Sequence, residues 1–135
     1  MKYFPKPAAP TCVAFFALLW AACESTTKPT AGDLLVGLST PNTDDRAAQL
    51  TIQCTQPPVS VSAKAGYLVY SDLGGSNVTL ILVRQGGQSI PSHADVATVR
   101  VQDVSKSCTA SLTSVAFQGY GVRTSFVGYS VSVKP

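Results

Sequence analysis

From residue 33 to the end of the chain, apolar and polar residues alternate with a period of two. Leu50, Ile52 and Cys54 share one parity, for example, with polar residues between them. Because successive side chains of a β-strand point to opposite faces, this pattern predicts strands with one buried face. The predicted strands number about eight and span residues 34–38, 50–54, 59–63, 67–70, 78–83, 99–101, 108–117 and 127–133.

Two of these segments have features of their own. The stretch 78–83 is apolar apart from Thr79, which is typical of a central strand that is covered on both faces. Within one segment, Leu112 has an even number and Val115 an odd number, so a regular strand would point their side chains to opposite faces. We therefore expect a β-bulge or a twist between these two residues.

Turn-forming residues separate the segments, and no helical spacing appears outside the N-terminal apolar run. Short strands at roughly regular spacing favour an all-β domain over residues 33–135. The predicted architecture is an antiparallel two-sheet, immunoglobulin-like sandwich of about 7–8 strands. An antiparallel barrel is the alternative.

The first 22 residues have the layout of an export signal. Lys2 and Lys6 precede an apolar run of about a dozen residues, which is shorter than the roughly 20 that a membrane-spanning helix needs. The run ends in Ala-Ala-Cys at Cys23, which resembles the lipobox of bacterial lipoproteins. The resemblance implies a signal peptide over 1–22 and a lipid on Cys23.

Trp20 bears on the alternatives, which are ordinary secretion and a retained membrane anchor. A lipobox usually has Leu, Val or Ile at this position, so Trp20 departs from that pattern. A secretory cleavage after Ala22 would need a small side chain there, so Trp20 disfavours that reading as well.

Residues 23–32 connect this signal to the predicted domain. They contain threonine, serine, lysine and proline but no large apolar side chain. Such a segment cannot bury enough surface to order itself, so we expect a flexible tether. The nine residues after Cys23 have, as loose coil, a root-mean-square reach of roughly 15–18 Å.

The four cysteines support export. Cys12 would leave with the signal peptide and Cys23 would carry the lipid, which leaves Cys54 and Cys108 in the exported domain. An even number of cysteines in an oxidising compartment predicts one disulfide, between Cys54 and Cys108. Two separate buried thiols are the alternative.

Charge excludes one class of partner. The chain after residue 22 has eight basic and seven acidic residues, and the basic residues are scattered. Phosphate contacts need concentrated positive charge, so we expect no nucleic-acid binding. A polar surface made mainly of Ser, Thr, Gln and Gly is typical of exported β-proteins.

The exported domain is similar to a group of short, uncharacterised bacterial lipoproteins. The similarity lies in its opening, Gly37-Leu-Ser-Thr-Pro-Asn-Thr-Asp-Asp-Arg-Ala, and in its closing strand, which contains Gly128-Tyr-Ser-Val. Arg46 stands where that group usually has glycine. The resemblance implies a lipid-anchored single β-domain and no assigned activity.

Three residues of the opening turn are candidate metal ligands. Asn42, Asp44 and Asp45 offer oxygen atoms of the kind that Ca²⁺ prefers. Asn and Asp after a proline also commonly satisfy the backbone of a turn, and no second acidic cluster is visible to complete a calcium site.

Two further residues have side chains that could take part in catalysis or binding. His93 is the only histidine, and we expect it in a solvated loop although Asp95 lies close in sequence. Tyr120 lies between Gly119 and Gly121, so we expect it to be exposed in a hairpin turn and to be a candidate for ligand binding. The other aromatic side chains are expected to pack in the core.

The sequence therefore predicts a lipid-anchored β-sandwich in a bacterial envelope, facing the periplasm or the exterior. The expected role is binding or envelope structure, without catalysis or cofactor. The expected contacts are the membrane, through Cys23, and an envelope protein or glycan. A secreted carbohydrate- or protein-binding module is the alternative, followed by a small hydrolase or a calcium-binding protein. The hydrolase reading requires His93, Asp95 and residues 42–45 to share one pocket.

Overall fold

A computed structural model describes residues 28–135 of the chain. The predicted signal peptide over 1–22, the lipidation site Cys23 and the first part of the tether lie outside the described residues. Within 28–135 the structure has nine β-strands and one short 3₁₀ helix, η1 (Gln85–Gly87). All strand pairs are antiparallel, and they form two sheets. The predicted all-β sandwich is confirmed.

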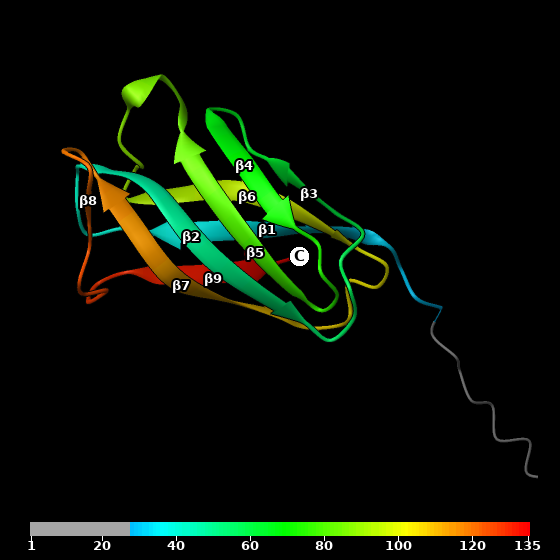
Figure 1. The fold of residues 1–135 in the computed structure, drawn as a ribbon. Coiled ribbons are helices and arrows are strands. Elements are labelled where there is room, and N and C mark those ends of the chain that lie inside the picture. Colours follow the sequence, from blue (N-terminus) through cyan, green and yellow to red (C-terminus); the bar gives the residue numbers. More distant parts are fainter. Residues whose placement is uncertain (1–27) are drawn as a thin grey trace, which may run out of the picture.

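Each sheet includes neighbouring strands that are distant in sequence (Figure 1). The four-stranded sheet has the order β3 (Ser60–Ala63), β6 (His93–Val101), β1 (Gly32–Ser39) and β9 (Ser130–Lys134). The five-stranded sheet has the order β4 (Tyr67–Asp72), β5 (Asn77–Arg84), β2 (Asp45–Cys54), β7 (Cys108–Phe117) and β8 (Gly121–Val122).

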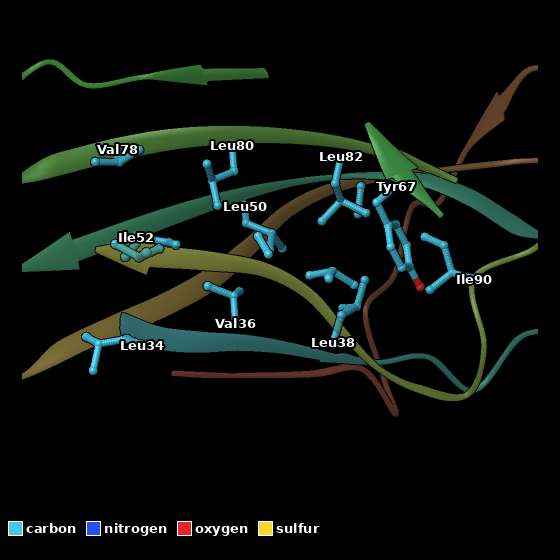
Figure 2. Packing of buried hydrophobic residues seen from close by; sticks show 14 of the residues in the cluster. Leu34, Val36, Leu38, Leu50, Ile52, Tyr67, Val78, Leu80, Leu82 and Ile90 are labelled. Carbon is cyan, nitrogen blue, oxygen red and sulfur yellow. The ribbon is translucent and has the colours of Figure 1, made fainter. Parts of the chain in front are cut away.

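The alternating residues of the two sheets meet in one apolar core. Figure 2 shows side chains from β1, β2 and β5 pointing into the space between the sheets. Burying an aliphatic side chain of this size stabilises the fold by about 2 kcal/mol. The apolar side chains of this core that are wholly inaccessible to solvent are Val36, Leu50, Ile52, Val78, Leu80, Leu82, Val96, Ala97 and Val99.

Strand β7 contains the parity change that the sequence predicts. Ser114 pairs with Gln49 and Leu112 pairs with Leu50, so Thr113 is the extra residue of a β-bulge. The bulge allows Leu112 and Val115 to face the same side although their parities differ.

A disulfide joins Cys54 to Cys108, as predicted. The two residues lie directly opposite each other on β2 and β7, so the bond links neighbouring strands of one sheet. The cysteines are 54 residues apart in sequence. On the chain-entropy model, closing a loop of this length stabilises the fold by about 4 kcal/mol.

The expectation that residues 78–83 are covered on both faces is wrong. Strand β5 contributes Val78, Leu80 and Leu82 to the core, but Ile81 is 45% exposed on the other face. Strand β2, not β5, lies at the centre of the five-stranded sheet. Tyr70 on the neighbouring strand β4 is 61% exposed and is not a core residue either. The outer face of this sheet is therefore partly apolar.

The two ends of the sandwich carry different segments. Residues 28–31 enter β1 at one end, where Thr30 accepts a hydrogen bond from the Val104 amide. Figure 1 shows β8 and the turns that follow β1 and β7 at the opposite end. We call this opposite end, formed by residues 40–44, 85–92 and 118–129, the distal end.

Candidate functional site

A buried carboxylate organises the distal end. Asp45, the first residue of β2, has no solvent exposure. Its Oδ2 accepts hydrogen bonds from the Thr40 hydroxyl and, at 2.6 Å, from the Tyr129 hydroxyl. Its Oδ1 accepts one from Arg123 Nε at 2.9 Å. Both oxygens are thus hydrogen-bonded, as a buried charge requires.

The partners of Asp45 are themselves held in place. Arg123 also forms an ion pair with Asp44, and its guanidinium lies 4.3 Å from the centre of the Phe117 ring. The Asn42 side-chain amide donates to the Tyr129 hydroxyl at 2.6 Å. We call the residues Thr40, Asn42, Asp44, Asp45, Arg123 and Tyr129 the Asp45 cluster. It connects the turn before β2 to the segment between β8 and β9.

The cluster stabilises the charged form of Asp45. Burial alone would raise the pKa of this carboxyl group, but the hydrogen bonds from Thr40 and Tyr129 and the charge of Arg123 outweigh it. The net effect is a pKa below the ordinary value. Burial and the bond to Asp45 raise the pKa of the Tyr129 hydroxyl, so Tyr129 keeps its proton and donates it.

The candidate calcium ligands Asn42, Asp44 and Asp45 are engaged by protein groups. Arg123 supplies the positive charge next to the two carboxylates. Within residues 28–135, no three His, Cys, Asp or Glu side chains are grouped as they would be around a metal ion. The arrangement is that of a structural ion pair, and it gives the calcium hypothesis no support.

His93 lies outside this cluster. It is the first residue of β6 rather than part of a loop, and its Nδ1 is 2.7 Å from the Ser39 hydroxyl. A serine beside a histidine is the start of a nucleophile–base pair, which a third group must orient. Asp95 is exposed on the same strand, and among residues 28–135 no hydrogen bond joins it to His93. Neither residue lines the hollows described below.

The outer face of the five-stranded sheet carries a row of apolar side chains. Strand register places one such residue from each strand side by side. Leu68 and Val122, at the two ends of the row, are 44% and 58% exposed. We call this set the apolar row; from β4 to β8 it consists of Leu68, Val83, Ala47, Ala116 and Val122.

A hollow of about 660 Å³ lies where this row meets the distal end. We call it the Tyr120 hollow; its lining is Arg46, Ala47, Val83, Ala116, Phe117, Gln118, Gly119 and Tyr120. Tyr120 is fully exposed in the turn between β7 and β8, as predicted. Its φ of 64° lies in the left-handed region, which costs a residue with a side chain about 1 kcal/mol.

Arg46 is a residue of this site that sequence reasoning did not single out. Asp45 pairs with Phe117 and Ala47 pairs with Ala116, which leaves Arg46 as the extra residue of a bulge in β2. The bulge lets Asp45 face inward while Ala47 faces outward. Arg46 then lines the hollow from the edge.

We predict that replacing Asp45 with asparagine destabilises the domain and removes part of its acid sensitivity. Breaking a buried ion pair costs about 3 kcal/mol at neutral pH. In the folded state the pKa of Asp45 lies below its ordinary value of 3.8. The charged carboxylate therefore contributes fully to the free energy of unfolding above the pKa of the unfolded chain. This contribution is lost as the pH falls through the folded pKa. The difference in the free energy of unfolding between wild type and Asp45→Asn, measured by urea unfolding, should therefore shrink below about pH 4.

Asp33→Asn is the control, because Asp33 forms an exposed ion pair with Arg100; such pairs contribute less than about 1 kcal/mol. Asp103, whose pKa is lowered by hydrogen bonds from Ser105, is present in both proteins and cancels in the comparison. Parallel stability curves for wild type and Asp45→Asn from pH 7 to pH 3 would contradict the assignment.

No protein-family model, curated protein or solved structure matches the chain. Within residues 28–135, no helix has the length and apolar character needed to cross a membrane.

Proposed function

We propose that the chain is a lipid-anchored binding protein of the bacterial envelope, held to a membrane through Cys23. It binds its partner with the outer face of the five-stranded sheet. The observation that carries the binding role is the apolar row, which crosses all five strands of this face.

The composition of the face supports recognition rather than a purely structural role. Contiguous exposed apolar patches on soluble domains commonly mark interaction sites. Tyr70 and Ile81 extend the patch next to the row, and Gln49 and Ser114 lie beside them in the adjoining register positions. Apolar side chains with neutral polar neighbours are typical of binding interfaces, whose centres are depleted in charge.

The arrangement of the ends supports presentation away from a membrane. The described chain begins at the end opposite β8 (Figure 1), with the last residues of the predicted tether, 28–32. A lipid on Cys23 would therefore hold the end of the domain opposite the distal end nearest to the bilayer. The Tyr120 hollow and the adjoining part of the apolar row would face outward.

The proposal assigns no catalysis and no cofactor to the domain. Asp45 is buried and paired, and His93 contacts Ser39 at the surface, outside the Tyr120 hollow. A secreted module that binds carbohydrate or protein would use the same face. Such a secreted module would carry no lipid on Cys23.

We predict that the protein purified from membranes begins at Cys23 and carries two or three acyl chains. Intact-mass measurement should show these acyl groups, and reduction should add about 2 Da because the Cys54–Cys108 bond opens. Cys23→Ala should move the protein out of the membrane fraction. An unlipidated chain that begins near Glu24 would contradict the anchor and leave the secreted module as the leading reading.

We predict that the apolar row contacts an envelope component in living cells. A photo-crosslinking amino acid at Leu68 or at Val122, in the full exported chain, should yield at least about fivefold more adduct than one at Ser62, since interfaces are local patches. Ser62 is the matched control because it is exposed on the other sheet, where it pairs with Thr98. Equal adduct formation from all three positions would contradict a binding face.

A further inference from the structure

The conformation of Tyr120 points to a ligand. The side chain is fully exposed, and the residue adopts a left-handed φ that glycine adopts without strain. Because the side chain is exposed, no burial of apolar surface offsets the free-energy cost of this backbone conformation. Residues in strained backbone conformations cluster at active sites and ligand-binding sites.

The Tyr120 hollow has the size and floor of a small-molecule site. Its volume of about 660 Å³ is within the range of ligand pockets. Ala47 and Ala116 pair across β2 and β7 and form a low floor because their side chains are short. A second hollow of about 140 Å³ shares these two alanines and adds Gln49 and Ser114. The two hollows therefore adjoin each other and together make a depression on this face of the sheet.

Arg46 supplies a positive charge to this depression. Among residues 28–135, Arg46 forms no ion pair, and its Nε is buried without a hydrogen-bond partner. Arg100 and Arg123, in contrast, are paired with carboxylates. The Arg46 guanidinium also lies beside Gly87, where an added Cβ would be 3.1 Å from Nη1. An arginine held in this way is complementary to an anion.

We propose that the Tyr120 hollow binds an acidic sugar, a uronic acid unit of a polysaccharide. The sugar ring stacks on Tyr120, its carboxylate pairs with Arg46, and its hydroxyls bond to neutral side chains of the rim. The inference rests on the binding role proposed above and specifies the ligand of that face.

Each feature of a uronic acid has a counterpart in the depression. Aromatic faces pack against the apolar side of a pyranose ring, and Tyr120 is free to do so. The planar guanidinium matches a carboxylate through two parallel hydrogen bonds. Gln49, Ser114 and Gln118 can donate and accept hydrogen bonds, as hydroxyl groups require, and these three residues line the two hollows.

The charge of Arg46 distinguishes this ligand from a neutral one. A neutral sugar would leave the Arg46 guanidinium, which forms no ion pair within residues 28–135, without an anionic partner, and so would an apolar peptide segment. Hydrogen bonds between a guanidinium and a carboxylate are roughly twice as strong as those between neutral groups. The structure therefore favours the acidic sugar over both.

The test uses the full chain, purified from membranes in detergent, and calorimetric titration with a trimer of galacturonic acid. The fully methyl-esterified trimer is the matched ligand control, because it keeps the rings and hydroxyls but lacks the charges. We expect the acid to bind at least tenfold more tightly than the ester, since only the acid can pair with Arg46.

Arg46→Gln should weaken binding of the acid at least tenfold and remove the preference over the ester. Tyr120→Gly should weaken both ligands to a similar extent; it removes the ring and also relaxes the backbone, so the variant folds. Arg100→Gln is the control, because Arg100 lies on the other sheet and pairs with Asp33. It should bind like the wild type.

Failure of the acid to bind, equal binding of the ester, or full binding by Arg46→Gln would overturn the proposal. If the crosslinks from Leu68 and Val122 form with a protein in that case, the binding role stands and the sugar is wrong. If these crosslinks are also absent, the binding role itself is wrong.

Discussion

One buried carboxylate gives the distal end of this domain its conformation. The segment from 118 to 129 contains a single two-residue strand, β8, and therefore has few ladder hydrogen bonds of its own. Arg123 and Tyr129 from this segment both bond to Asp45. A segment with so little regular structure needs such fixed partners to adopt one conformation, because ordering each residue costs about 1–2 kcal/mol in backbone entropy.

The same part of β2 determines where the hollow lies. Asp45 faces the core and Ala47 faces outward, and the bulge at Arg46 permits this reversal. In a regular strand Asp45 and Ala47 would face the same side of the sheet. Without the bulge, Asp45 would therefore point away from its hydrogen-bond partners, or Ala47 would point into the core instead of lying in the apolar row. The buried ion pair and the exposed apolar row are thus two consequences of one irregularity in one strand. Loss of Asp45 should therefore also disturb the position of the Tyr120 side chain, since Tyr120 lies between Phe117 and Arg123 in the chain.

Local sequence signals predicted the features that depend on neighbouring residues. Alternation predicted the strands, and the opposite parities of Leu112 and Val115 predicted the bulge in β7. The flanking glycines predicted that Tyr120 is exposed. The Cys54–Cys108 bond followed from counting cysteines, although the sequence did not tell which strands it joins.

Features that depend on topology were not predictable in this way. Asp45 and Arg123 are 78 residues apart, and only the sheet order β2-β7-β8 brings them together. The turn around Asp45 therefore resembled a metal site. The apolar run of β5 resembled a strand covered on both faces, because an outward apolar residue such as Ile81 looks like a core residue in sequence. Arg46 stood out only as a departure from the glycine of the similar lipoproteins, because its place beside the hollow depends on the register of β2.

The measurement that tests this account most directly is ¹⁵N NMR relaxation of the wild type and of Asp45→Asn under native conditions. It reports motion within the folded state, so a change in overall stability does not affect it. We expect the Arg123 and Tyr129 amides of the wild type to have order parameters of about 0.85, like the strands, and to fall below about 0.6 in the variant. Amides of β1 and β6 should not change. A segment between β7 and β9 that stays as rigid in Asp45→Asn as in the wild type would contradict the central role of Asp45.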